Sequence, residues 1–140
     1  MKNKFIVNGE EKTEKVYLVC PYVDRDRAEY RTKELSQLAE SALLEIVKTN
    51  LFLVKEINAR TYFGIGKVEQ IRDEVKELGA DVVIFDCPLT GSQLRNLGEI
   101  IGVKTIDRTM LILDIFAGRA KSGEKRSWRI KEVKDTNFQL

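Results

Sequence analysis

The amino-acid sequence predicts a single α/β domain built on a four-stranded parallel sheet. Short apolar runs alternate with longer segments of helical periodicity, in the order β-α-β-α-β-α-β-α. Alternation of this kind with short connections is typical of parallel strands joined by right-handed crossovers. The 140 residues, 43% hydrophobic and 33% charged, have the composition of an ordinary globular domain. We therefore expect helices packed on the sheet, followed by a basic C-terminal tail.

The first predicted strand and helix lie in the N-terminal third of the chain. The run Val16–Cys20 is apolar, and we expect Pro21 to end it because proline donates no ladder hydrogen bond. Apolar residues then recur at helical spacing over 26–48 and predict one long amphipathic helix. A second strand is expected at 51–54, extending to residue 57.

The middle of the chain predicts a loop, a helix and the most regular strand. We expect a loop over 58–66, followed by a helix from Val68 to Leu78. Gly79 stands where a left-handed C-cap would end that helix. The β-branched run Asp81–Asp86 is typical of a central parallel strand.

Two further helices complete the predicted fold. Thr90 and Ser92 are candidate N-caps for a helix that runs to residue 101 and ends at Gly102. A fourth strand is expected at 103–106, and the residues 108–120 are apolar enough to form a largely buried helix.

Composition excludes several classes of protein. The chain has no histidine, which removes the commonest general base and metal ligand, and its two separated cysteines are too few for a structural zinc site. We expect Cys20 and Cys87 to be reduced thiols. No apolar run approaches the roughly 20 residues that a membrane-spanning helix needs, and the polar segment 1–15 lacks a signal-peptide core. These features predict a soluble, cytoplasmic protein.

The C-terminal segment differs in character from the rest. Its apolar periodicity stops near Gly123, and basic residues dominate from Arg119 to Lys134. Seven basic residues stand there against Glu124 and Glu132. We expect an α/β domain over 1–120 and a basic segment over 121–140, which is either frayed or the start of a helical extension.

One glycine motif suggests an anion contact. The residues Gly64-Ile-Gly66-Lys67 follow a strand and open a helix, where main-chain amides can hold an anion. A Walker A loop needs four residues between its glycines and a hydroxyl residue after its lysine, and Val68 stands there instead. The dinucleotide fingerprint fails because Glu69 occupies the place of its third glycine. Two interpretations of this motif therefore remain open, a tight turn before a helix and a contact with an anion or RNA phosphate.

The candidate acidic residues do not have the spacing of a catalytic pair. Asp86 and Asp107 flank strand ends, and Asp114 lies within an apolar helix, so no spacing fixes a pair on one face. Such residues act more often as caps or ion-pair partners. Arg108 and Arg119 are equally compatible with structural pairing and with ligand contact.

Several ordered sequence strings resemble the N-terminal domain of the HflX family of ribosome-associated GTPases. They are Tyr62–Val68, Ala80–Asp86, Leu89 with Ser92–Leu97, Val103 with Ile106–Thr109, Leu111–Ala117, and Arg119-Ala120. The resemblance covers residues 16–120 and is strongest from Thr61 onward.

The resemblance implies binding to the large ribosomal subunit, a role in splitting or rescuing stalled ribosomes, and a GTPase domain in cis that carries GTP and magnesium. Some members of the family are also reported to bind ATP outside the GTPase domain. The chain departs from the family after Ala120, and no Walker A loop is present. We therefore expect no catalytic residues, no metal site, no resident cofactor and no GTP hydrolysis by this chain alone.

Three hypotheses follow. The first is an accessory module that contacts ribosomal RNA. The second is an adenine-nucleotide-binding domain, a binder or weak ATPase, with ligand at strand C-terminal ends near 64–67 and 87–92. The third is an interaction fragment whose uncovered apolar surface drives self-association. The candidate contact residues for nucleotide, phosphate or rRNA are Gly64, Gly66, Lys67, Ser92, Gln93, Arg95, Asn96, Arg108 and Arg119.

Overall fold

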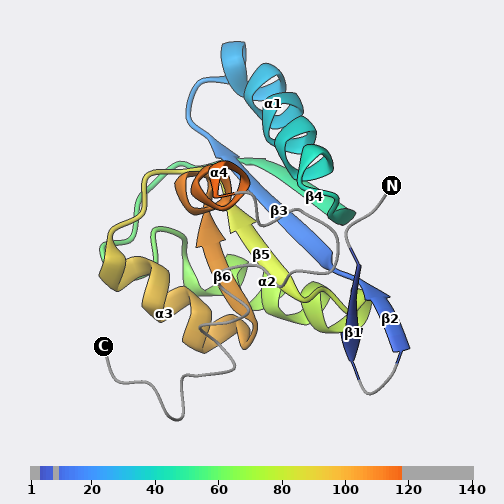
Figure 1. Ribbon diagram of the computed structural model, residues 1–140. Coiled ribbons are helices and arrows are strands. Elements are labelled where there is room, and N and C mark those ends of the chain that lie inside the picture. Colours follow the sequence, from blue (N-terminus) through green and yellow to red (C-terminus); the bar gives the residue numbers. More distant parts are fainter. Residues whose placement is uncertain (1–3, 8–9, 118–140) are drawn as a thin grey trace.

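The structure, a computed structural model, describes residues 4–7 and 10–117 (Figure 1). The expected division into segments 1–120 and 121–140 stays a prediction, because the basic tail lies outside the described residues. The elements in chain order are β1 (Lys4–Val7), β2 (Glu10–Thr13), β3 (Lys15–Tyr22), the 3-10 helix η1 (Arg25–Arg27), α1 (Ala28–Ser41), β4 (Glu45–Leu53), α2 (Ile65–Leu78), β5 (Val82–Phe85), α3 (Gly91–Ile101), β6 (Lys104–Asp107) and α4 (Arg108–Phe116).

The predicted four-stranded parallel sheet is confirmed. Its strand order is β4-β3-β5-β6, and each neighbouring pair is parallel. An antiparallel hairpin of β1 and β2 forms a separate two-stranded sheet that the sequence analysis missed. Strand β2 is entirely polar and the apolar run of β1 is only three residues long, so neither stands out as a strand, although the Asn8-Gly9 pair in the sequence between them is a common hairpin-turn sequence.

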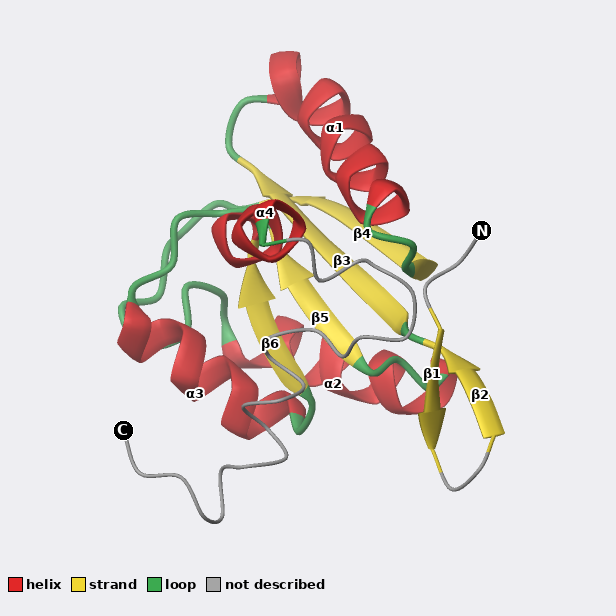
Figure 2. Cartoon of the chain, in the orientation of Figure 1, coloured by secondary structure: helices red, strands yellow, loops and turns green. Residues whose placement is uncertain are grey.

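Two helices cover each face of the parallel sheet. Helices α1 and α4 lie on one face, and α2 and α3 lie on the other (Figure 2). Strand β3 serves both layers, because Leu18 points into the core beneath α1 and α4 while Tyr17 and Val19 point beneath α2 and α3. This alternation is what a central strand buried on both faces requires.

The long helix expected over 26–48 is wrong at its C-terminal end. Helix α1 ends at Ser41, and the chain turns through Leu43, whose φ of 62° is left-handed. Ile46 continues the helical spacing by coincidence and lies in β4, which begins at Glu45 rather than at residue 51. A half-exposed edge strand has weak alternation, so its start was hidden in the sequence.

Pro21 does not end its strand, contrary to expectation. Strand β3 continues to Tyr22, whose carbonyl accepts from the Val54 N–H at 2.8 Å. Successive residues of a strand direct their main-chain N and C=O groups to opposite neighbouring strands. Because Tyr22 faces β4, the main-chain nitrogen of Pro21 faces β5. Strand β5 has already ended there, with Phe85 opposite Val19. The missing proline N–H therefore costs no ladder hydrogen bond.

The helix ends are mostly as predicted. Gly79 and Gly102 have left-handed φ values of 70° and 87° at the C-caps of α2 and α3. Thr90 caps α3, whereas Ser92 makes no cap. The helix expected over 108–120 is described only to Phe116, and the expectation that it is largely buried is wrong for that side chain, which is 82% exposed.

Candidate functional site

A cleft of about 700 Å³ opens at the carboxyl ends of β3, β5 and β6. The chain leaves β3 toward β4 on one side of the sheet, and it leaves β5 toward β6 on the other. The cleft therefore lies at the switch point where open α/β sheets commonly bind ligands. Its walls include Tyr22 at the end of β3, Arg27 in η1, Cys87 and Leu89 after β5, and Arg108 at the start of α4.

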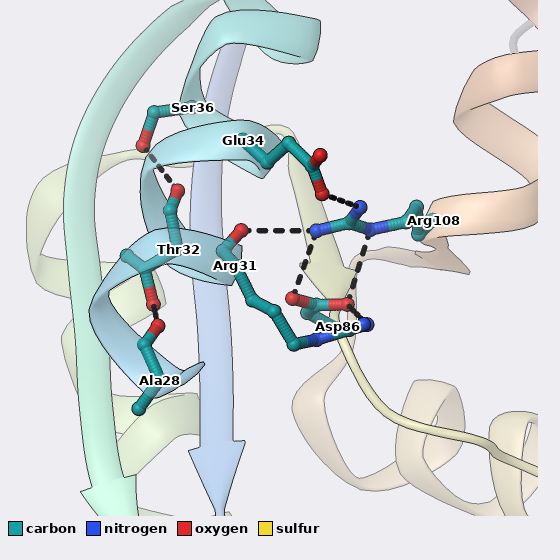
Figure 3. Close-up of polar contacts among 7 residues, drawn as sticks. All are labelled: Ala28, Arg31, Thr32, Glu34, Ser36, Asp86 and Arg108. Atoms are coloured by element: carbon teal, nitrogen blue, oxygen red, sulfur yellow. Dashed lines mark hydrogen bonds and ion pairs between the residues drawn. The ribbon is translucent and has the colours of Figure 1, made fainter. Parts of the chain in front are cut away.

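Asp86 is the centre of a polar network at the floor of this cleft (Figure 3). It directly follows β5, and its side chain is only 4% exposed. Arg108 binds both oxygens of this carboxylate, with Nε 3.1 Å from Oδ1 and Nη2 3.1 Å from Oδ2. Arg31 on α1 donates to Oδ1 at 2.8 Å. Two guanidinium groups therefore neutralise one buried carboxylate.

Arg108 also ties α4 to α1. Its Nη1 donates to Glu34 Oε1 at 2.9 Å, and its Nη2 donates to the Arg31 carbonyl at 3.0 Å. Four of its five N–H donors are thus engaged inside the domain. The hydrogen bond from Arg108 lowers the pKa of Glu34 below its usual range. Arg108, a candidate ligand contact, has a structural role in this conformation.

The two thiols beside the cleft are poor nucleophiles. Both cysteines are free, as expected. Desolvation by burial raises the pKa of Cys20 to about 11 and that of Cys87 to about 12. Thiolate is the reactive form of cysteine, so neither residue is activated for covalent catalysis.

The glycine motif lies outside the large cleft, beside a groove of about 240 Å³. Gly64 is the N-cap of α2 with φ −62°, and an added Cβ at Gly64 or Gly66 would meet nothing within 4 Å. The turn therefore uses no glycine-specific backbone, and Tyr62 takes the left-handed conformation instead, with φ 67°. Lys67 places Nζ 4.0 Å from the centre of the Phe52 ring, and burial lowers the pKa of this lysine.

Helix α3 holds the loop that precedes this motif. Gln93 completes a capping box with Thr90 and donates from Nε2 to the Ala59 carbonyl at 3.1 Å. Asn96 donates from Nδ2 to the Arg60 carbonyl at 3.0 Å. These two candidate residues therefore have defined structural roles.

The remaining candidates divide into three groups. Ser92 and Arg95 are exposed on α3, close to the fixed loop. Arg108 lies across the domain at the cleft, and Arg119 lies outside the described residues. The structure thus places the candidates on α2 and α3 on one face of the sheet, whereas Arg108 begins α4 on the other face.

The acidic candidates have no catalytic arrangement. Asp107 is the N-cap of α4 and accepts from the Met110 N–H at 2.9 Å, whereas Asp114 is buried within the helix. In the portion described, no group of three or more His, Cys, Asp or Glu residues could hold a metal ion. None of the described helices is long and apolar enough to cross a membrane.

Three residues of these sites, Arg31, Glu34 and Arg60, were not predicted from the sequence. Asp86 and Arg108 follow neighbouring strands, so their proximity follows from the predicted topology. Arg31 and Glu34 join them from α1, and nothing in the local sequence indicates that contact. Arg60 lies in a predicted loop with no local signal, and only the hydrogen bond from Asn96, the neighbour of Arg95, to its carbonyl gives it a place beside α3.

Known proteins match both the sequence and the fold. The model of the family described as GTP-binding GTPase N-terminal matches residues 29–117. GTPase HflX of Alkalihalophilus pseudofirmus is 43% identical over 113 residues, which cover 79% of this chain and 27% of that protein. GTPase HflX of Caldanaerobacter subterraneus is 46% identical over 91 residues, which cover 65% of this chain and 21% of that protein.

A solved structure shows the same fold. The crystal structure of a GTP-binding protein from Sulfolobus solfataricus in complex with GDP aligns with a TM-score of 0.55 and 23% identity, covering 75% of this chain and 30% of that chain. The chain therefore spans only about a quarter of the length of the two HflX relatives, 27% and 21%. On the strength of the family match and these identities, the chain belongs to the GTP-binding GTPase N-terminal family and corresponds to the N-terminal domain of GTPase HflX proteins.

Proposed function

We propose that this domain is the accessory module of an HflX-type GTP-binding protein in the cytoplasm, that it binds ribosomal RNA of the large subunit, and that it serves ribosome splitting or rescue. Arg60 and Arg95 carry this proposal. Both are exposed, and no hydrogen bond or ion pair joins either side chain to another described residue. Asn96, the neighbour of Arg95, donates to the Arg60 carbonyl at 3.0 Å, so the main chain of Arg60 lies beside α3, and we refer to this place as the corner.

Two free guanidinium groups, carried by a loop and a helix whose main chains are held together, suit phosphate binding. Arginine binds phosphate oxygens through paired N–H groups, and contacts of this kind position a protein on nucleic acid. The loop is already held by Gln93 and Asn96, so little conformational entropy is lost when it binds. Lys67 adds a positive charge on the same face of the sheet, at the start of α2.

Co-sedimentation with purified large ribosomal subunits tests the proposal. Replacement of both Arg60 and Arg95 by alanine is expected to weaken binding at least tenfold, at about 1 kcal/mol or more per lost phosphate contact. The control replaces Lys33 on α1 and Lys76 on α2, which removes the same charge from other exposed positions. Equal losses in both double variants would mean that only net charge matters and would contradict the proposed corner.

We infer that this chain does not hydrolyse GTP by itself. Phosphoryl transfer needs a phosphate-binding loop and a magnesium site, and the sequence contains no Gly-x-x-x-x-Gly-Lys-Ser/Thr motif. In the family the GTPase domain lies in the same polypeptide as this module. Phosphate release from GTP by the purified chain, above a no-protein blank, would refute the inference.

Adenine nucleotide binding in the large cleft is a second candidate function. The location of the cleft at the switch point favours it, and Arg27 stands exposed in the wall without a described ion-pair partner. The glycine motif belongs to the other groove, so the site would use residues 87–89 rather than 64–67. Calorimetry with ATP is expected to give heat that Arg27→Ala reduces, and no heat at millimolar ATP would remove this candidate.

A further inference from the structure

The groove of about 240 Å³ beside the glycine motif has aromatic walls and lies between the end of β4 and the start of α2. Phe52 and Phe63 both line it, with ring centres 5.5 Å apart. Phe63 is 2% exposed and fixed in the core, whereas Phe52 is only partly buried. Pockets for drug-sized ligands measure roughly 300–1,000 Å³, so this smaller groove suits one flat group such as a nucleic-acid base.

Gly64, which lines the groove, is not required to be glycine by the fold. Its φ of −62° and ψ of 152° are open to any residue, and an added Cβ would meet nothing within 4 Å. Glycine is also used where a ligand approaches the main chain closely. The missing side chain therefore leaves the groove open beside this main chain, and a large side chain here would narrow it.

The charges at the groove favour an anionic partner. Among the described residues that line it, Lys55 and Lys67 are basic and Glu56 is acidic. Lysines beside aromatic side chains are typical of proteins that bind single-stranded nucleic acid, because the aromatic groups contact bases while the cations contact phosphates.

The ammonium group of Lys67 is held at the groove without an ion pair to a described carboxylate. Its Nζ lies 4.0 Å from the centre of the Phe52 ring. The neighbouring carboxylate of Glu74 pairs instead with Lys48 at 2.9 Å. Lys67 is therefore available to contact a phosphate of a ligand that lies against Phe52.

The groove adjoins the loop that carries Arg60. Lys55 precedes this loop and Gly64 follows it, and a bridge between Asn58 and Tyr62 folds the residues between them into a turn that contains Arg60. An RNA strand bound at the corner therefore has the groove a few residues away along the same loop.

We propose that this groove receives one unpaired base of the bound RNA, which packs against Phe52 beside Gly64 while Lys67 contacts its phosphate. The inference rests on the proposed RNA-binding function and specifies the form of RNA that the domain prefers. Bases in a duplex are stacked inside the helix and cannot enter a groove of this kind. The domain therefore binds single-stranded RNA more tightly than duplex RNA, a preference that phosphate contacts alone do not give.

Fluorescence anisotropy with a labelled RNA of about 12 nucleotides, single-stranded or paired with its complement, tests this groove at one fixed salt concentration. The full chain is expected to bind the single strand at least fivefold more tightly than the duplex, from the usual strength of a base–aromatic contact. Gly64→Leu and Phe52→Leu should each remove this preference by weakening single-strand binding at least fivefold, with duplex binding unchanged. Gln37→Leu is the control, because it adds an exposed leucine on α1 without changing charge.

Each outcome bears on the proposal. Circular dichroism is expected to show that the variants are folded, and Gly64→Leu is the safer of the two because Gly64 is exposed. Equal affinity of the wild-type chain for the two RNAs overturns the groove. Groove variants that weaken both RNAs equally, or that behave like Gln37→Leu, also overturn it.

The ribosomal proposal is tested separately from the groove. The double replacement of Arg60 and Arg95 by alanine is expected to weaken single-stranded and duplex RNA alike, because both forms present phosphates. A groove that fails its test leaves this corner standing. A single-strand preference without binding to large ribosomal subunits would support the groove and refute the ribosomal role, and a wild-type chain that binds neither would refute both.

Discussion

Arg108 donates from Nε and Nη2 to the two carboxylate oxygens of Asp86, both at 3.1 Å, and so joins the first residue of α4 to the end of β5. The same guanidinium reaches Glu34 on α1 at 2.9 Å. One side chain therefore connects α1 and α4, the two helices of one face, to the end of β5 (Figure 3). The floor of the cleft depends on this connection.

Loss of this guanidinium is expected to destabilise the domain strongly. Removing one partner of a buried ion pair costs about 3–5 kcal/mol, and we expect Arg108→Ala to lie near the lower end because Arg31 still neutralises Asp86. Arg31→Ala should cost only about 1 kcal/mol or less, because that side chain is 52% exposed. Urea unfolding measures both variants, and equal costs would show that Arg108 is not the principal partner.

Acid is expected to weaken the fold through Glu74. Hydrogen bonds from Tyr17 and Lys48 lower the pKa of Glu74 in the folded state below its usual value of 4.5. A group with a depressed folded pKa stabilises the protein above its unfolded pKa, and this contribution is lost as pH falls through the folded pKa. The free energy of unfolding should therefore decrease below about pH 4.5. Glu74→Gln should flatten part of this decrease, and an unchanged profile would contradict the assignment.

Both cysteines are expected to react slowly with iodoacetamide. Cys20 is 2% exposed, and the raised pKa values of about 11 and about 12 keep both thiols protonated at pH 8. Mass spectrometry of the native chain should find both thiols largely unmodified under conditions that label a cysteine-containing peptide fully. The denatured chain is the control, in which both should label. Rapid labelling of native Cys87 would contradict the described burial.

The contacts of Gln93 are expected to support the loop that carries Arg60. Gln93→Ala removes one half of the capping box and the hydrogen bond to the Ala59 carbonyl, and each is worth about 1 kcal/mol. We expect a total loss of about 2 kcal/mol in thermal or urea unfolding, together with weaker ribosome binding. Ser92→Ala, one residue away and exposed, should change stability by less than about 0.5 kcal/mol. Similar losses in the two variants would argue against a specific role for Gln93.

The sequence predicted the parallel sheet because its central strands are apolar on both faces. The run that became β5 alternates between two buried layers and has no competing periodicity. The ends of α2 and α3 were equally predictable, because Gly79 and Gly102 adopt backbone angles that other residues avoid. The start of β4 was not predictable from periodicity, since Ile46 fits a helix and an edge strand equally well.

The site was only partly predictable. Strand-end residues such as Asp86 and Arg108 follow from the order of parallel strands, whereas the contribution of Arg31 depends on how α1 is placed over β3. Arg60 gained its significance from a tertiary hydrogen bond to Asn96. Long-range contacts of this kind leave no local signal in a single sequence.

The salt dependence of binding to the large ribosomal subunit tests the central claim most directly. Each phosphate contact contributes about one unit to the slope of log affinity against log salt concentration. The wild-type domain should therefore show a steep negative slope, and replacement of Arg60 and Arg95 by alanine should make it shallower by about two units. Binding that is independent of salt, or a slope that the double substitution leaves unchanged, would contradict the claim that these two arginines contact ribosomal RNA.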